Sequence, residues 1–258
     1  MSKPKKDDKK ESSVPLNLKS KEECHIKGAP LVHKYGKGNI CTTDGVGFEM
    51  PKGRLPLEIV VDASEGLVPL WKEDSVLRWE FDENYLSVFS NPEEIKDYIR
   101  EIFAEALLKW DFAVPVKFSE NSKSWDFQLR VEADNNCSPI GCTLARAFFP
   151  GPGRNDLLLY PKMFEQCRKE QVNTMIHELG HVFGLRHFFA DVNERAWPSE
   201  AFGEHCAFSI MNYGDQSELT DSDKDDLALL YQLAWSGELK DINGTKIMFF
   251  SPYHEQCS

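Results

Sequence analysis

Hydrophobic and polar residues alternate along the stretch SVLRWEF, residues 75–81. Leu77, Trp79 and Phe81 occupy alternate positions, and Arg78 and Glu80 fall between them. A period of two is typical of a strand that buries one face. We predict a strand here, and further strands over residues 57–62, 115–120, 125–132, 142–149 and 157–161.

A different period begins at residue 91, in NPEEIKDYIREIFAEALLKW. Its apolar residues recur every three or four positions, which places them on one stripe of a helix. These residues are Ile95, Tyr98, Ile99, Ile102, Phe103, Ala106 and Leu107. Asn91 is suited to cap this helix, and Pro92 is suited to its first turn. The pattern predicts an amphipathic helix over residues 91–110 that packs on a core.

Two further helices are expected in the second half of the chain, over residues 164–183 and 219–234. Thr220 and Asp223 have the spacing of a capping box at the start of the second one. Its buried stripe would consist of Leu227, Leu230, Tyr231 and Ala234. A strand, a helix and then several strands indicate an α/β (α+β) fold, with one sheet and helices packed against it.

The first 55 residues do not share these patterns. Residues 1–20 are rich in Lys, Asp, Ser and Pro, so we expect a disordered, charged tail. Residues 21–55 show no clear period and are interpreted as an N-terminal extension or a pro-segment. The folded domain is expected over residues 56–258, a length that can bury one sizeable core.

The net charge of −12 and the pI of about 5.1 argue against nucleic-acid binding, which requires a basic face for phosphates. The chain has no run of about 18 apolar residues, so we predict no transmembrane helix and no membrane partner. Its N-terminus also lacks the apolar stretch of a signal peptide. We therefore expect a cytoplasmic or otherwise intracellular protein, and we expect a monomer.

Seven cysteines are scattered along the chain without a metal-type CxxC pair, and their odd number argues against a complete disulfide framework. They are Cys24, Cys41, Cys137, Cys142, Cys167, Cys206 and Cys257. Cys137 and Cys142, in CSPIGC, could close a small loop in an oxidising compartment. Free thiols, the usual state in a reducing compartment, are the interpretation that we favour.

Three of the seven histidines lie within HELGHVFGLRH, residues 177–187. Residues four apart share one face of a helix, so His177 and His181 can both direct an imidazole at one metal ion. Gly184 permits the positive φ that ends a helix, so His187 can return as a third ligand. Three neutral imidazoles that leave one position open are typical of a catalytic zinc rather than a structural one.

Glu178 follows His177 and therefore points about 100° away from the axis of the two histidines. Its carboxylate can then lie over the open position, take a proton from metal-activated water and pass it to a leaving amine. The alternative is a helix whose histidines are satisfied by hydrogen bonds in the core. HExxH alone arises by chance in roughly one chain of this length in a hundred or two, and Gly184 and His187 lower this about a thousandfold. We therefore favour the metal site.

HELGHVFGLRH matches the pattern HExxHxxGxxH, and SIMNYG, residues 209–214, supplies a methionine downstream. On these motifs the chain resembles the metzincin clan of zinc endopeptidases, and the matrixins most of all. The resemblance implies that His177, His181 and His187 bind one catalytic zinc. It also implies that Glu178 is the general base and acid, and that Met211 lies in a Met-turn beneath the metal.

The resemblance covers about residues 75–235 and implies a metzincin-like catalytic domain. Such a domain has a twisted, mostly parallel sheet of about five strands with an antiparallel edge strand, and three main helices. By this resemblance residues 56–184 form an upper subdomain and residues 185–258 a lower one, with the zinc cleft between them. A peptide substrate would bind extended along the edge strand near residues 142–149, by β-addition.

SIMNY also resembles astacins and serralysins, in which the tyrosine two residues after the methionine approaches the zinc. This resemblance implies that Tyr213 stabilises an oxyanion, and a core tyrosine is the alternative. The residues of the matrixin structural zinc and calcium sites are not evident between residues 120 and 165. We therefore expect one zinc and consider calcium doubtful.

Three other hypotheses remain open. A non-catalytic, zinc-stabilised binding module would use a fourth ligand such as His205, although the retained Glu178 argues against it. A latent enzyme would be blocked by its N-terminal segment through the thiol of Cys24 or Cys41. In the glutamate-ligand zincins a downstream glutamate completes the site, and the available glutamates are Glu194, Glu200 and Glu204.

Overall fold

The computed structural model describes residues 14–18, 39–40, 59–63, 66–138, 141–187, 199–202, 209–211 and 218–256. Its centre is a five-stranded sheet in the order β5-β4-β6-β10-β9. The strands are β4 (Val76–Phe81), β5 (Lys117–Glu120), β6 (Phe127–Val131), β9 (Ala145–Arg146) and β10 (Asn155–Leu159). All neighbours pair in parallel except β9, which is antiparallel to β10. The predicted α/β fold, with a mostly parallel sheet and an antiparallel edge strand, is confirmed.

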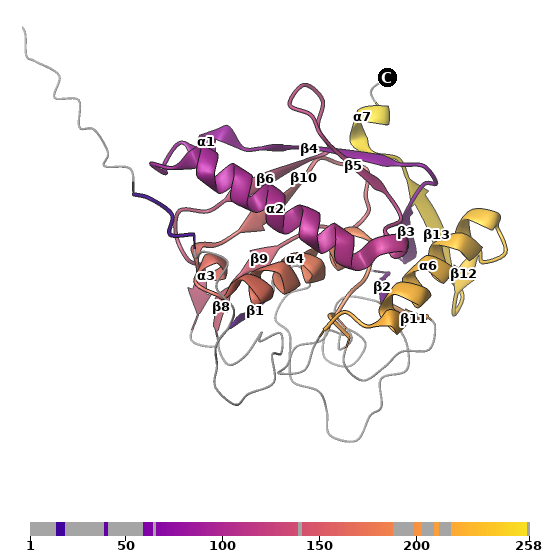
Figure 1. Cartoon of the computed structure of the whole chain (residues 1–258). Helices are drawn as coiled ribbons and strands as arrows, with labels where there is room; N and C mark the ends of the chain where they lie inside the picture. Colours follow the sequence, from indigo (N-terminus) through magenta and orange to yellow (C-terminus); the bar gives the residue numbers. More distant parts are fainter. Residues whose placement is uncertain are drawn as a thin grey trace, which may run out of the picture.

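Two long helices, α2 (Pro92–Trp110) and α4 (Arg168–Val182), pack against each other. Figure 1 shows α2 crossing in front of the sheet, with α4 below it. The predicted stripe of α2 faces the sheet: the ring of Phe103 lies 5.4 Å from that of Trp79 and 5.3 Å from that of Phe118. Burial of these rings between the helix and the sheet is a large apolar contribution to stability.

The third main helix, α6 (Asp221–Ser236), begins with the predicted capping box. The hydroxyl of Thr220 accepts a hydrogen bond from the backbone N–H of Asp223, and the carboxylate of Asp223 accepts one from the backbone N–H of Thr220. The helix ends at Gly237, whose φ of 76° is left-handed.

Shorter elements complete the described part of the chain. The strands are β1 (Asn39–Ile40), β2 (Ile59–Asp62), β3 (Leu67–Trp71), β7 (Cys137–Ser138), β8 (Gly141–Thr143), β11 (Ser199–Phe202), β12 (Asp241–Ile242) and β13 (Thr245–Phe250). The helices are α1 (Glu83–Leu86), η1 (Asp111–Ala113), α3 (Pro161–Phe164) and α7 (Tyr253–Gln256). The strands form three small sheets, β1-β8-β7, β11-β2 and β12-β13-β3.

Sequence patterns do not predict β3 and β13, which pair in parallel and join distant parts of the chain. β3 contains Pro69, and a proline argues against a central strand because it has no N–H to donate. In its sheet, however, β3 is the edge strand. The turn before β13 carries a signal that could have been used, since Asn243 and Gly244 both have positive φ, as the hairpin turn of an Asn-Gly pair requires.

Residues 14–18 fall within the segment predicted to be a disordered tail, and they pack on the domain. Asn91 stands at the N-cap of α2, but its side chain does not cap the helix. Its amide oxygen instead accepts a hydrogen bond from the backbone N–H of Leu16, at 3.0 Å, and its amide nitrogen donates to the carbonyl of Leu16, at 3.1 Å. Leu16 is buried, so this short stretch has apolar surface to shield.

The expectation of free thiols at Cys137 and Cys142 is wrong. The two cysteines form a disulfide, because the antiparallel pairing of β7 with β8 places them directly opposite each other. Cys167 is also disulfide-bonded. Disulfides are typical of an oxidising compartment, which counts against the intracellular location expected above. The location itself stays a prediction.

Across the described ranges, no helix combines the length and the apolar character needed to cross a membrane. This agrees with the prediction made from the apolar runs of the sequence.

Candidate metal centre

Helix α4 carries the first part of the histidine motif, and its end fits the predicted role of Gly184. The helix ends at Val182, and Gly184 adopts a φ of 94°. The N–H of Leu185 donates to the carbonyl of Gly180, and the N–H of Gly184 donates to that of His181, both at 2.9 Å. These two bonds are those of a Schellman motif, which turns the chain back across the helix end. A side chain at Gly184 would also meet the carbonyl oxygen of Pro69.

This turn brings the three histidines together. His177, His181 and His187 are fully buried, and their ligand nitrogens all lie within 4.8 Å of one another. The Nε2 atom of His177 is 3.0 Å from that of His187 and 3.2 Å from that of His181. The sequence predicted this cluster from spacing alone.

Backbone carbonyls determine which ring nitrogens face the cluster. Nδ1 of His177 lies 2.8 Å from the carbonyl oxygen of Ile210, and Nδ1 of His181 lies 2.8 Å from that of Leu185. A carbonyl only accepts, so each Nδ1 carries the proton and donates. Each Nε2 of these two rings is then left with a lone pair that points into the cluster.

The donor set fits zinc. In a tetrahedral site with zinc–nitrogen bonds of about 2.0–2.1 Å, neighbouring nitrogens are roughly 3.3 Å apart, close to the spacing seen here. Lone pairs that face one another at this distance repel. A cation between them relieves this repulsion, because each lone pair then donates to the cation. Three imidazoles also leave a fourth position for water or substrate.

Met211 packs directly on α4 beside the histidines. It is buried, and its sulfur occupies the place where a β-carbon on Gly180 would lie. The glycine of HELGH therefore lets the chain at 209–211 approach the helix closely. The same stretch supplies the carbonyl of Ile210 to His177, a contact that no side-chain motif could have revealed.

Two aromatic side chains hold the C-terminal end of α4. The indole N–H of Trp71 donates to the carbonyl of Val182, at 2.7 Å, and the phenol of Tyr231 donates to that of Phe183, at 3.1 Å. Carbonyls at a helix end have no partner within the helix, so these bonds satisfy them. Burial raises the pKa of Tyr231 well above its usual value, which keeps the phenol protonated as a donor.

Glu178 is fully buried within α4, next to His177 in the chain. Its role as general base stays a prediction. Tyr213 and His205 lie outside the described residues, as do Cys24 and Cys41. The predicted roles of these four side chains likewise stay predictions.

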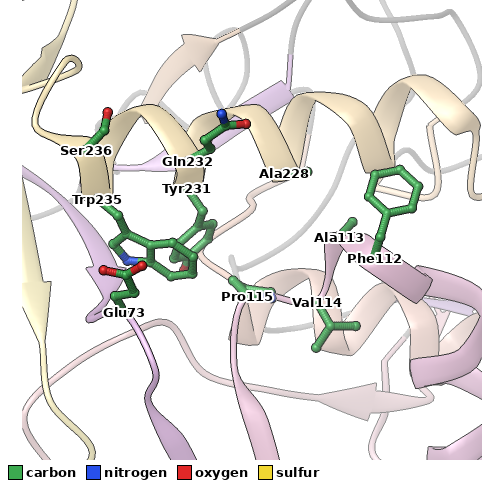
Figure 2. Close-up of a pocket in the computed structure, with 10 residues that line it drawn as sticks. All are labelled: Glu73, Phe112, Ala113, Val114, Pro115, Ala228, Tyr231, Gln232, Trp235 and Ser236. Carbon is green, nitrogen blue, oxygen red and sulfur yellow. The ribbon is translucent and has the colours of Figure 1, made fainter.

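A separate pocket lies between α6 and the turn that leads from α2 to β5. It encloses about 410 Å³. Figure 2 shows Trp235 and Phe112 at its two ends, and Glu73 beside Trp235. None of the predicted metal ligands lines it, so this pocket does not belong to the metal centre.

Part of this chain, including the histidine cluster, matches a known protein family. Residues 71–193 match the model of the matrixin peptidases. This part of the chain is matrixin-like. The matched region contains β4, α2, the five-stranded sheet and all three histidines, whereas β2 and Met211 fall outside it.

Among solved structures, the chain is similar to that of myroilysin, with a TM-score of 0.42 and 16% sequence identity. The similarity covers 67% of this chain and 98% of the myroilysin chain. No curated protein matches the sequence.

Proposed function

We propose that this protein is a zinc-dependent endopeptidase. The observation that carries the proposal is the convergence of the Nε2 atoms of His177, His181 and His187, with two of the Nδ1 atoms held by backbone carbonyls. The matrixin-like region around them supports a metallopeptidase rather than another zinc protein. The histidines would hold one zinc; no role for calcium is proposed.

A zinc ion held by these nitrogens supplies Lewis-acid activation of a water molecule and of the substrate carbonyl. Glu178 takes one proton from the attacking water as the new carbon–oxygen bond forms. It then delivers that proton to the amide nitrogen as the carbon–nitrogen bond breaks, so an acid and an amine leave the site. Met211 forms the floor beneath the ligands, and Tyr213 stabilises the oxyanion.

The substrate would lie extended along β9. In the described part of the chain, the five-stranded sheet ends at β9, and this strand also contacts α4. The adjoining strand β8 is already paired with β7 and with β1 of the N-terminal extension. The segment proposed for β-addition is therefore Ala145–Arg146 and the residues that follow, rather than all of 142–149.

The test uses the full chain loaded with one equivalent of zinc and a mixed peptide library, with cleavage products identified by mass spectrometry. Cleavage is expected from the native chain and not from Glu178→Gln at matched zinc content. If both forms hold zinc and neither cleaves, the proposal fails and a zinc-stabilised binding module becomes the better interpretation. Cleavage only after removal of residues 1–55 would identify a latent enzyme.

A further inference from the structure

Strand β2 lies upstream of the matrixin-like region, yet it contacts the chain on both sides of the third histidine. Val61 forms an antiparallel bridge with Leu185, and the N–H of Asp62 donates to the carbonyl of Gly184, at 3.0 Å. The same strand pairs along its length with β11, which follows His187 in the sequence. The loop that presents His187 is therefore attached to β2 before and after the ligand.

A buried ion pair reinforces this attachment. A guanidinium nitrogen of Arg186 lies 3.6 Å from a carboxylate oxygen of Asp62, and the two side chains are only 2% and 6% exposed. The guanidinium is always charged, and a buried charge is costly unless it is paired. Arg186 immediately precedes His187, so the pair holds the backbone next to the ligand.

The same guanidinium connects to a second ligand. It lies 5.7 Å from the ring centre of Phe149, and the ring of Phe149 meets that of His181 edge-on, at 5.5 Å. Asp62, Arg186 and Phe149 thus form a chain of contacts that reaches the histidine cluster from the side of β2.

His187 needs such support more than the other two ligands do. His177 and His181 lie on α4, whose backbone hydrogen bonds fix their spacing. His187 follows the helix end and has no helical frame. Its position depends on the contacts of residues 184–186, which are made with the end of α4 on one side and with β2 on the other.

We propose that Asp62 is a positioning residue for the metal ligand His187, and that it acts through Arg186. The proposal rests on the proposed function only in taking zinc as the bound metal. It assigns residues upstream of the matrixin-like region to the metal centre itself.

The test measures the zinc affinity of the full-length apo-protein by competition with a chromophoric chelator, without substrate. Asp62→Asn keeps the shape of the side chain and removes its charge. We expect zinc to bind about tenfold more weakly, the lower end of the cost of losing an outer partner of a metal ligand, because Asp62 acts on His187 only through Arg186. Asp62→Glu, which restores the charge, is expected to recover part of the affinity.

The matched control is Asp82→Asn. Asp82 is also buried and paired with an arginine, with 3.0 Å between its carboxylate and Nε of Arg130. It caps α1, which Figure 1 shows on the opposite side of the molecule from β2, and an asparagine can keep that cap. This variant should lose stability and keep the native zinc affinity. Equal affinities for Asp62→Asn and Asp82→Asn would overturn the proposal.

If Asp62→Asn fails to fold, the double variant Asp62→Asn, Arg186→Gln decides, because it removes the charges of both members of the pair. It should fold and still bind zinc at least about tenfold more weakly than the native chain. Native affinity in this variant would show that the pair has no positioning role. Zinc binding is read without cleavage, so a native chain that holds zinc but cuts no peptide would refute the endopeptidase and leave this proposal standing.

Discussion

His177 and His254 are both shielded histidines, and they differ in the groups that their ring nitrogens face. Nδ1 of His177 lies 2.8 Å from a backbone carbonyl, whereas Nδ1 of His254 lies 2.9 Å from the carboxylate of Asp126. A carbonyl is neutral and fixes the tautomer, so Nε2 remains available to a cation. The carboxylate of Asp126 anchors α7 to the start of β6. What distinguishes His177 is its Nε2 atom, which faces the Nε2 atoms of His187 and His181 at 3.0 Å and 3.2 Å.

The largest expected effect comes from exchanging the two kinds of histidine for alanine. His181→Ala should weaken zinc binding by more than the roughly 100-fold that loss of an outer partner costs, because it removes a ligand. His254→Ala should leave zinc affinity within about twofold. Chelator competition measures both. A similar loss of affinity in the two variants would erase the distinction drawn here.

Asp126→Ala removes the carboxylate partner of His254, the second histidine of the comparison. It removes a buried carboxylate that accepts from the ring and the backbone N–H of His254 and from the backbone N–H of Arg78. We expect a loss of about 3–5 kcal/mol in the free energy of unfolding, with unchanged zinc affinity. Denaturant titration measures the loss. The exposed pair of Asp74 with Lys117 supplies the control, and Lys117→Ala should cost less than about 1 kcal/mol.

Gly180→Ala tests the close approach of Met211 to α4. A β-carbon there would overlap the methionine sulfur, so the chain at 209–211 must move and take the carbonyl of Ile210 with it. We expect a loss of about 1–3 kcal/mol and a weaker zinc site, despite the better helix propensity of alanine. Gly153→Ala, where the added carbon meets nothing within 4 Å, should leave both quantities nearly unchanged. Thermal unfolding and zinc titration decide between these outcomes.

The smallest effect is expected at the capping box of α6. Thr220→Ala removes the acceptor for the N–H of Asp223 and should cost about 1 kcal/mol of stability. Zinc affinity should not change, because Tyr231, the residue of α6 that supports the end of α4, lies about three turns further along the helix. Thr220→Ser keeps the hydroxyl and should recover most of the loss. A weaker zinc affinity in Thr220→Ala would instead show that the start of α6 contributes to the support of α4.

Long periodic segments were predictable because local chemistry decides them. The stripe of α2, the capping box of α6 and the left-handed Gly184 all depend on residues within a few turns of one another. The histidine cluster belongs to the same class, since two ligands share a helix face and the third follows a glycine-directed turn.

Contacts between distant segments were not predictable from the same patterns. Arg186, a charged residue within a buried motif, signals that a partner exists, but nothing in its neighbourhood points to Asp62. The disulfide of Cys137 with Cys142 required the register of β7 and β8. The parallel pairing of β3 with β13 required edge positions that no single strand reveals.

The class of the fold, its main helices and the cluster of three histidines follow from periodicity and turn chemistry within short stretches of the sequence. The surroundings of the histidines arise only from tertiary contacts: the carbonyl of Ile210 behind His177, the sulfur of Met211 against Gly180, and the strand with Asp62 beside Gly184 and Arg186. Every residue has the same backbone carbonyl, so no sequence pattern identifies the one that contacts His177. The ion pair between residues 62 and 186 exists only once the chain between them has folded.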